Sequence, residues 1–549
     1  MKIALAQYNP IVGDIPGNTS RMADMIDAAA EDRAQLVVFP ELSIPGYPPR
    51  DLLSKEHFVA DNVAAVEELA SHCTRVAALV GYVRPTPDSS GRPIQNVAAL
   101  LHQGKIAHVH VKALLPTYDV FDETRYFQPG TEIGTIELGG TTLGLSVCED
   151  LWDADALGRE LYGDDPVGRL AREGASMIIN MAASPYQMGK AVVREDLFRR
   201  QAARAGCPIV YVNQVGGNDE LVFDGCSAVV WPDGRVVARA KPFAEDLLLI
   251  DTDAPDTARI EPLGEPIERL RSALQTGLRD YAYKCGFESA VLGLSGGIDS
   301  AVVAVLAADA LGGENVLAIA MPSRYSSDHS LNDAEQLARN CGLDYRTVPI
   351  EPMHAAFEGA LQRDIDPAAA EVAAENVQAR IRGTIVMAYS NALGHLPLAT
   401  GNKSELSVGY CTLYGDMAGG LAPLGDVYKM QVYHLAEHIN AIAGTDRIPQ
   451  NIIDKPPSAE LKPDQTDQDK LPEYPLLDAI LERYIEQDMT AGAIAREGYD
   501  LEVVRRVVRM VDLAEYKRKQ AAPVLKMTAR AFGQGRRMPI AQRYRHEGG

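Results

Sequence analysis

The chain has 549 residues, which is too long for one compact core, so two domains are expected. Asp and Glu number 75 against 53 Lys and Arg, and the formal net charge of -22 argues against a general nucleic-acid or membrane binder. The seven cysteines form no C-x-x-C pair, so neither a zinc site nor a disulfide framework is indicated.

The N-terminal residues run directly into a strand-like pattern, without the features of a signal peptide. No later apolar run approaches membrane-spanning length. We therefore expect reduced thiols and a cytoplasmic location.

The first half alternates short β-rich runs with helical stretches, which indicates an α/β domain. The runs are 36–39, 76–80, 143–147, 177–180 and 209–213. Trp231-Pro232-Asp233-Gly234 marks a hairpin turn, 247–250 a closing strand, and 251–266 is punctuated by Pro, Asp and Gly. The expected division is a domain at 1–253, a linker at 254–266 and a second domain at 267–549.

The second half begins with an amphipathic pattern at 267–284, followed by apolar strand patterns at 290–294, 316–321 and 392–400. The renewed alternation of strand and helix predicts a doubly wound parallel sheet. The segment 455–474 is rich in Pro, Asp, Gln and Lys, which predicts a mobile loop outside the core.

Three charged or nucleophilic residues follow apolar runs in the first half. Cys148 comes directly after 143–147, Glu41 follows 36–39, and Lys112 ends a third run. A lone cysteine of this kind is usually a small core residue, and single strand-end charges are usually surface ion pairs. Taken together, the three resemble the catalytic set of the nitrilase, or carbon–nitrogen hydrolase, superfamily over most of 1–253, which implies an α-β-β-α sandwich.

The chemistry of amide hydrolysis needs these three residue types. A thiol of ordinary pKa requires a base, so Glu41 would take the proton of Cys148 and later protonate the departing ammonia. Lys112 would stabilise the oxyanion of the tetrahedral intermediate. The resemblance implies glutamine as the amide, with Tyr118, Ser184 and Lys190 at positions of the family's glutamine pocket, although each could be ordinary loop chemistry.

A phosphate-binding turn is predicted between the strand at 290–294 and the following helix, where free N–H groups and the helix dipole favour negative charge. It comprises Gly293, Leu294, Ser295, Gly296, Gly297, Ile298, Asp299 and Ser300. A Walker loop is absent, since the nearest approach is Gly401-Asn402-Lys403-Ser404. The Ser-Gly-Gly-x-Asp-Ser pattern resembles that of the ATP pyrophosphatases, and the alternative is an ordinary strand-to-helix turn.

Three further segments, 375–382, 399–410 and 414–429, resemble NAD synthetase, so the whole chain is similar to the glutamine-dependent NAD synthetases. This resemblance implies a Rossmann-like second domain of the adenine nucleotide alpha hydrolase type, which joins ATP, deamido-NAD+ and ammonia from L-glutamine. The family usually forms homo-oligomers.

Site residues of the second domain are carried over from the same resemblance. It implies ATP contacts at Thr400, Lys429 and Ser458, deamido-NAD contacts at Asn376, Glu405 and Lys517, and Mg²⁺ on Asp299 and Glu405. Asp299 could instead cap its helix, and Lys517 could belong to a solvated helix end. Leu413 departs from the short, ammonia-using enzymes, which carry a basic residue there.

Two other functions are compatible with parts of the sequence. One is an ATP pyrophosphatase that modifies tRNA, which would need an RNA-sized basic patch that the acidic composition does not favour. The other is an amidase whose second domain only binds a regulatory nucleotide, which would predict a damaged phosphate loop.

Overall fold

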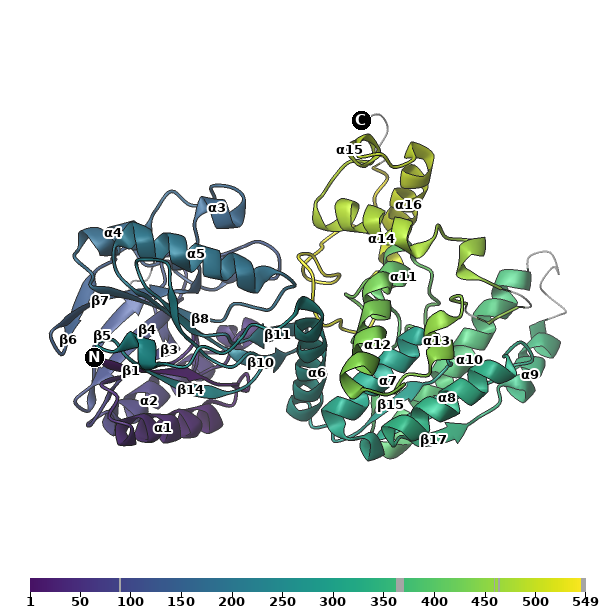
Figure 1. Cartoon of the computed structure of the whole chain (residues 1–549), viewed down its shortest axis with the longest axis horizontal. Coiled ribbons are helices and arrows are strands. Elements are labelled where there is room, and N and C mark those ends of the chain that lie inside the picture. The colour runs from purple at the N-terminus through teal and green to yellow at the C-terminus, as the bar shows by residue number, and fades with distance from the viewer. Residues whose placement is uncertain (88–89, 362–369, 459, 463–464, 545–549) are drawn as a thin grey trace. The chain divides into compact units, whose positions relative to one another are not determined.

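The computed structural model describes residues 1–87, 90–361, 370–458, 460–462 and 465–544. The chain divides into two compact units, Met1–Pro266 and Ile267–Gly549. In Figure 1 the first unit is coloured from purple to teal and the second from teal to yellow. Among the described residues, no helix is long and apolar enough to cross a membrane.

Two six-stranded sheets form the centre of the first unit. The first sheet has the order β14 (Asp246–Asp251), β1 (Lys2–Gln7), β2 (Leu36–Val38), β3 (Ala77–Pro85), β4 (Ile94–His102), β5 (Lys105–Val111). The second has the order β13 (Val236–Arg239), β12 (Ala228–Val230), β9 (Ile209–Asn213), β8 (Met177–Ala182), β7 (Thr141–Val147), β6 (Thr135–Leu138). A separate hairpin pairs β10 (Val215–Asn218) with β11 (Leu221–Asp224).

Helices cover the outer face of each sheet. Helices α1 (Ile15–Glu31) and α2 (Glu56–His72) lie on the first sheet, and α4 (Pro166–Arg172) and α5 (Lys190–Ala205) lie on the second. The short helix α3 (Ala154–Leu157) contacts α5. These layers confirm the predicted α-β-β-α sandwich.

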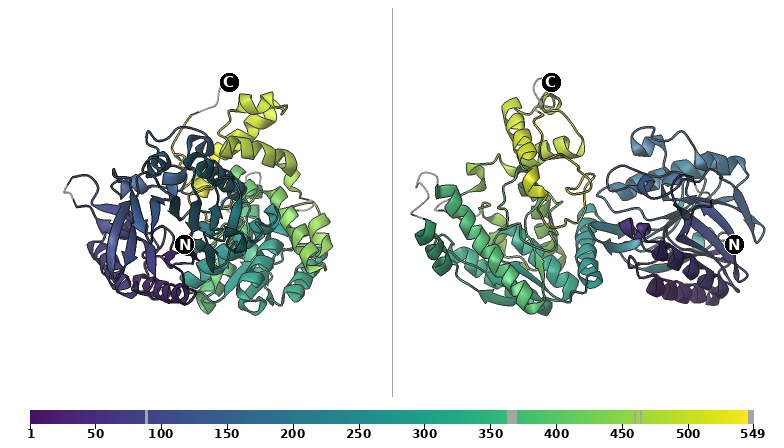
Figure 2. Two further views of the ribbon diagram at one scale, coloured as in Figure 1. Left: turned by 60° about the vertical axis from the view of Figure 1, so that its left-hand side comes forward. Right: turned by 180° about the vertical axis from the view of Figure 1, so that it is seen from behind.

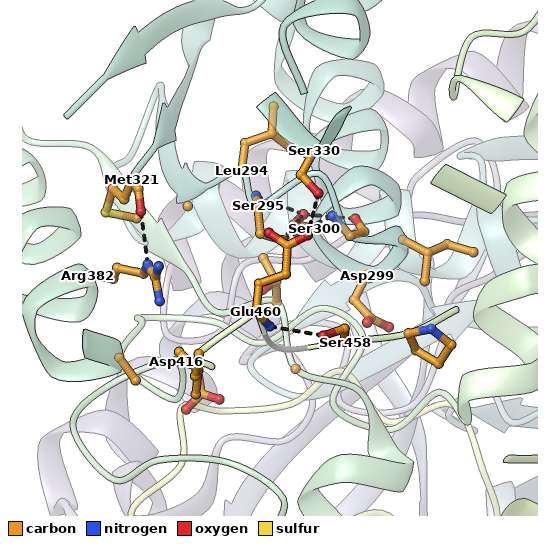
Figure 3. Close-up of a pocket in the computed structure, with 18 of the residues that line it drawn as sticks. Leu294, Ser295, Asp299, Ser300, Met321, Ser330, Arg382, Asp416, Ser458 and Glu460 are labelled. Carbon is orange, nitrogen blue, oxygen red and sulfur yellow. Dashed lines mark hydrogen bonds between the residues drawn. The ribbon is translucent and has the colours of Figure 1, made fainter. Parts of the chain in front are cut away.

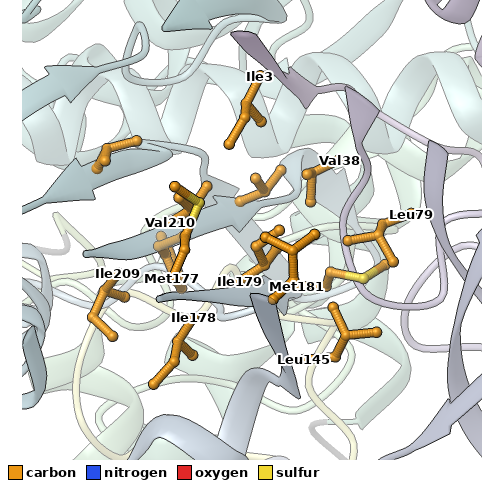
Figure 4. Close-up of a cluster of buried hydrophobic side chains, with 14 of the residues drawn as sticks. Ile3, Val38, Leu79, Leu145, Met177, Ile178, Ile179, Met181, Ile209 and Val210 are labelled. Atoms are coloured by element: carbon orange, nitrogen blue, oxygen red, sulfur yellow. The ribbon is translucent and has the colours of Figure 1, made fainter. Parts of the chain in front are cut away.

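The alternation of side chains along each strand explains the layering. Ile3, Val38 and Leu79 of the first sheet belong to one buried cluster with Leu145 and Met181 of the second (Figure 4). Their neighbours along the strands, such as Ala4 and Val37, belong to a second cluster that includes Met22 of α1. The strands are therefore apolar on both faces, which is why they appear in the sequence as continuous apolar runs.

The second unit contains one parallel sheet with the order β17 (Asp344–Thr347), β16 (Val316–Ala320), β15 (Ala290–Gly293), β18 (Leu396–Leu398). Strands β16 and β17 are added on one side of β15 and β18 on the other. The carboxyl end of β15 is therefore the point where the winding changes direction, which is where ligands bind in doubly wound sheets.

The helices of the second unit pack on this sheet and on a further cluster. They are α6 (Pro266–Lys284), α7 (Ile298–Leu311), α8 (Asp328–Cys341), α9 (Glu351–Leu361), α10 (Ala370–Leu393), α11 (Lys403–Val408), α12 (Lys429–Ala443), α13 (Gln450–Asp454), α14 (Tyr474–Leu481), α15 (Ala491–Arg496), α16 (Leu501–Leu513) and α17 (Glu515–Arg518). Helices α14 to α16, yellow-green in Figure 2, build a separate apolar cluster with α11.

The strand expected within 392–400 is present but shorter, as the three-residue strand β18, because α10 continues through Leu393. One sequence-based expectation is wrong in this unit. The segment 455–474 is not excluded from the core, since Asp467, Leu471 and Tyr474 are buried and the last two belong to the α14–α16 cluster. Residues 459, 463 and 464 of that segment lie outside the described residues.

Two candidate active sites

Cys148 lies at the end of β7, where a short 3₁₀ turn (Cys148–Leu151) begins. Its backbone φ is 45°, in the region that favours glycine, so the turn at this position is sharp. The buried carboxylate of Asp150 accepts the backbone N–H groups of Val147 at 2.9 Å and of Leu114 at 2.8 Å. Asp150 thus fixes the Cys148 turn against the segment that follows Lys112.

Glu41 and Lys112 form a fully buried ion pair beside this turn. The Lys112 ammonium donates to Glu41 Oε1 at 2.6 Å, and Asn96 donates to the same oxygen at 2.7 Å. The other Glu41 oxygen accepts the N–H of Ala183 at 3.2 Å. The Glu41 carboxylate is therefore held as a hydrogen-bond acceptor in a site that water does not reach.

The protonation of Cys148 follows from the same burial. Burial raises the pKa of the Cys148 thiol well above its usual range, the charge of Glu41 raises it further, and the Lys112 ammonium lowers it. Burial opposes the charge of Lys112, but Glu123 and Glu41 raise the Lys112 pKa well above normal. The resting site therefore holds a neutral thiol, an ammonium and a nearby carboxylate.

Glu123 is a second buried carboxylate that the sequence did not reveal. It accepts from Lys112 at 2.8 Å and from the Tyr47 hydroxyl at 3.0 Å. Burial raises the pKa of Glu123 to about 7, although Lys112 lowers it. Glu123 lies in a short 3₁₀ turn (Glu123–Arg125) and not at a strand end, so the pattern that identified Glu41 and Lys112 could not find it.

Of the predicted glutamine-pocket residues, Tyr118 and Ser184 lie next to residues of this centre in the chain or through a hydrogen bond, and Lys190 lies against Trp152. The Tyr118 hydroxyl donates to the buried Glu149 carboxylate at 2.9 Å, directly beside Cys148 in the chain. Ser184 follows Ala183, whose N–H reaches Glu41, and is itself buried. The Lys190 ammonium lies 5.5 Å from the ring centroid of Trp152.

In the second unit, the predicted phosphate turn joins β15 to α7 at the carboxyl end of the sheet. The Ser295 hydroxyl accepts the N–H of Gly297 at 3.1 Å, and the Ser300 hydroxyl donates to the Gly297 carbonyl at 3.0 Å. Gly296 has φ +76°, and a Cβ at this position would lie 2.3 Å from the Ser330 carbonyl oxygen. Only glycine fits there.

A cavity of about 300 Å³ opens over this turn. Figure 3 shows Ser295, Asp299 and Ser300 together with Arg382 and Asp416 around it. Of the predicted residues, those that line the cavity are Gly293, Leu294, Ser295, Gly297, Ile298, Asp299, Ser300, Thr400, Glu405, Lys429 and Ser458. Gly296, Asn376 and Lys517 are not part of the lining.

The charged centre of the cavity is Lys429, at the start of α12. Its ammonium donates to Asp299 at 2.5 Å and to Glu405 at 3.4 Å, and Asn402 donates to the other Asp299 oxygen at 2.9 Å. Burial and the charge of Asp299 raise the pKa of Glu405 to about 8, while Lys429 lowers it. Gly297 is the N-cap of α7 and no side-chain cap bond is made there, so the structure does not support the cap alternative for Asp299.

The remaining two predicted dinucleotide contacts act on one loop. Asn376 accepts from the Thr412 hydroxyl at 2.8 Å, and Lys517 donates to the carbonyls of Gly409 and Cys411, each at 2.7 Å. Thr412 lines the cavity. Asn376 and Lys517 therefore hold the cavity wall instead of forming it, and Lys517 is not merely a solvated helix end.

Lys403, the lysine of the Walker-like tetrapeptide, is structural. It is fully buried and lies outside the cavity lining, with Asp426 and Glu486 each 2.9 Å from its ammonium. This position agrees with the absence of a Walker loop from the sequence.

The sequence also missed several lining residues of the cavity, namely Ser330, Arg382, Asp416, Lys455, Glu460 and Asp467. Asp416 accepts the Thr412 N–H at 2.6 Å, and burial raises its pKa to about 6. Of these residues, Arg382 and Asp416 lie in segments on which the resemblance depended.

Comparisons with known proteins cover both units. A carbon-nitrogen hydrolase family model matches residues 2–261, and an NAD synthase model matches residues 270–521. The chain is 45% identical to a glutamine-dependent NAD(+) synthetase of Synechocystis, covering 100% of this chain and 99% of that protein. It is 41% identical to the protein of that name from Thermotoga maritima, over 99% of both.

A solved structure is similar over nearly the same extent. The glutamine-dependent NAD+ synthetase of Acinetobacter baumannii in complex with adenosine diphosphate is 39% identical, covers 98% of each chain and has a TM-score of 0.78. With two relatives above 40% identity over essentially its full length, the chain belongs to the family of glutamine-dependent NAD(+) synthetases.

Proposed function

We propose that this chain makes NAD+ from deamido-NAD+, ATP and L-glutamine, with L-glutamate, AMP and diphosphate as the other products. The observation that carries this proposal is the presence of two chemically complete sites in one chain of this family. One holds a buried thiol, carboxylate and ammonium, and the other is a cavity on a pyrophosphate-type turn. An amidase with a merely regulatory second unit is not favoured, because the turn and its charged centre are intact.

In the first unit, the Cys148 thiol attacks the side-chain amide of glutamine. Because its pKa is raised, the thiol needs a base at the moment of attack, and Glu41 takes the proton and later delivers it to the departing ammonia. Lys112 stays charged between Glu41 and Glu123 and stabilises the oxyanion. Water then hydrolyses the thioester.

The glutamine itself is bound beyond the reacting amide by Tyr118, Ser184 and Lys190. Lys190 provides a positive charge for the α-carboxylate. The buried Glu149 accepts hydrogen bonds from the hydroxyl groups of Tyr118 and Tyr162. Its carboxylate provides a negative charge for the α-ammonium. This pairing would select a zwitterionic amino acid over a simple amide.

In the second unit, the nicotinate carboxylate of deamido-NAD+ attacks the α-phosphate of ATP and diphosphate leaves. Ammonia then displaces AMP from the adenylate and forms the carboxamide. The N–H groups of the Gly293–Ser300 turn and the Lys429 ammonium bind the polyphosphate, with Thr400 and Ser458 as further contacts. Asn376, Glu405 and Lys517 serve the dinucleotide, two of them by holding the 409–412 wall.

Magnesium fits this site as the partner of ATP. Asp299 and Glu405 would hold it, because both line the cavity and a cation would relieve the mutual repulsion that, with burial, raises the pKa of Glu405 beside their shared Lys429 ammonium. No group of three potential protein ligands exists among the described residues, so nucleotide oxygens would complete the coordination. When bound, the ion neutralises phosphate charge.

The same proposal extends to the setting of the enzyme. We expect a cytoplasmic homo-oligomer that acts on small molecules and not on nucleic acid or membranes. The test of the reaction is product stoichiometry: purified chain with the three substrates and magnesium should release NAD+, AMP, diphosphate and glutamate in equal amounts. Release of ADP and phosphate, or no NAD+ at all, would contradict the proposal.

A further inference from the structure

A carboxylate of the chain itself lies against the phosphate turn. Glu460 accepts from the Ser330 hydroxyl at 2.7 Å and from the Ser327 hydroxyl at 3.2 Å (Figure 3). The Lys455 ammonium donates to the same Ser330 hydroxyl at 3.0 Å. Two hydroxyl groups and one ammonium thus surround one anionic group.

This cluster is continuous with the predicted phosphate turn. The Ser330 carbonyl occupies the place that a side chain on Gly296 would need, at 2.3 Å from an ideal Cβ. Ser330, Lys455 and Glu460 line the same cavity as Ser295 and Asp299. An anion that extends from the turn along the cavity wall would meet these donors.

The charges around Glu460 are also those of an anion site. Arg382 lines the cavity, and its Nε donates only to the Met321 carbonyl, at 3.0 Å, among the bonds of the described residues. Burial lowers the pKa of Arg382 to about 10, and Glu460 is the charge that raises it. Burial also lowers the pKa of Lys455, while Glu460 and Asp333 raise it.

Glu460 adopts a backbone conformation that its residue type disfavours. Its φ is +49°, in the left-handed region that L residues other than glycine disfavour. Its N–H donates to the Ser458 hydroxyl at 3.2 Å. The hydrogen bonds from Ser327 and Ser330 to its carboxylate hold the residue in this conformation against the turn.

We propose that Ser327, Ser330, Lys455 and Arg382 form the subsite for the diphosphate that leaves ATP, and that the Glu460 carboxylate fills this subsite in place of phosphate. Carboxylate and phosphate oxygens accept from the same hydroxyl, ammonium and guanidinium donors. The inference rests on the proposed function for the identity of the anion. The Glu460 carboxylate and the diphosphate therefore compete for the same donors. Glu460 must withdraw when the diphosphate, which is also negatively charged, enters.

The test is binding of inorganic pyrophosphate with magnesium to the full-length chain, measured by titration calorimetry. Glu460→Gln removes the competing charge and should tighten pyrophosphate binding by about three- to tenfold. Ser330→Ala and Lys455→Met should weaken it by about tenfold each, since a hydrogen bond to a charged group is lost. Glu351→Gln is the matched control, because its carboxylate pairs with Arg324 outside the cavity lining and should change nothing.

Measuring AMP binding distinguishes a variant that has lost only the diphosphate subsite from a variant that is misfolded. AMP lacks the β and γ phosphates, so its affinity should be the same in all four variants, and a misfolded variant would lose it. The proposal is overturned if Ser330→Ala and Lys455→Met bind pyrophosphate like the wild type, or if Glu460→Gln binds it more weakly. A chain that shows the predicted pyrophosphate pattern but makes no NAD+ would instead contradict the proposed function and leave the subsite standing.

Discussion

Lys112 bridges two carboxylates in a fully buried site, with its ammonium 2.6 Å from Glu41 and 2.8 Å from Glu123. The two carboxylates are not equivalent. Only Glu41 also accepts hydrogen bonds from Asn96 and from the backbone of Ala183, the residue before Ser184 of the proposed glutamine pocket. We therefore propose that Glu41 transfers the proton and that Glu123 keeps Lys112 charged and in place.

Replacing Glu41 tests this assignment. Glu41→Gln keeps the shape of the side chain but removes the proton acceptor, so glutamine-supported NAD+ synthesis should fall by about 10²- to 10⁴-fold. Synthesis from ammonium should be unchanged, because the second unit does not use Glu41. Equal loss with both donors would contradict the assignment.

The raised pKa of Glu123 predicts that the free energy of unfolding of the first unit depends on pH. Its pKa is raised from 4.5 to about 7, so the folded state holds this proton more tightly than the unfolded state does. Stability from this group is therefore present at low pH and is lost as the pH rises from about 4.5 to about 7.

The change can be followed in the first unit alone, because both tryptophans, Trp152 and Trp231, lie there. We expect the denaturant midpoint of tryptophan fluorescence to fall with pH in this range for the wild type, and the slope to be smaller for Glu123→Gln. Identical slopes would show that Glu123 does not titrate as described.

Replacing Lys403 should lower the stability of the second unit, whereas replacing Lys429 should weaken ATP binding. Lys403→Met leaves Asp426 and Glu486 without their buried ammonium, so it should destabilise the second unit by about 3–5 kcal/mol. Lys429→Met should instead abolish tight ATP binding, since Lys429 lines the cavity. Chemical unfolding and ATP titration of both variants distinguish them. A well-folded Lys403→Met variant with weakened ATP binding would contradict the structural role of Lys403.

Gly296→Ala should disable the phosphate turn. The added methyl group would meet the Ser330 carbonyl at 2.3 Å, in addition to the strain of φ +76°. Gly342→Ala is the matched control, because φ is +66° there and no atom lies within 4 Å of the new Cβ. We expect Gly296→Ala to lose pyrophosphate binding and Gly342→Ala to retain it at a cost of about 1 kcal/mol in stability. Retained pyrophosphate binding by Gly296→Ala would show that the close approach to the Ser330 carbonyl does not shape the turn.

The sequence predicts the layers of the fold because the strands are apolar on both faces and the turns carry Gly, Pro and Asp. It also predicts the residues that directly follow strand ends, such as Lys112 and Cys148. It cannot predict Glu123, Glu149 or Glu460, because each is an ordinary-looking acidic residue in a turn or loop, and its place in a site depends on distant parts of the chain.

The same limit applies to 455–474. Its polar composition suggests an exposed loop, yet Asp467 and Tyr474 are buried and joined by a hydrogen bond of 2.8 Å. A polar segment can be part of a core where it covers a polar cavity. The pattern of apolar residues in the sequence does not distinguish such a segment from an exposed loop.

We propose that one chain makes ammonia in its first unit and uses it in its second. NAD+ formation from deamido-NAD+, ATP and magnesium can be compared between the wild type and Cys148→Ala, with either glutamine or ammonium as donor. We predict that the variant loses glutamine-supported synthesis and keeps ammonium-supported synthesis at the wild-type rate. Retention of glutamine-supported synthesis by Cys148→Ala would contradict the claim.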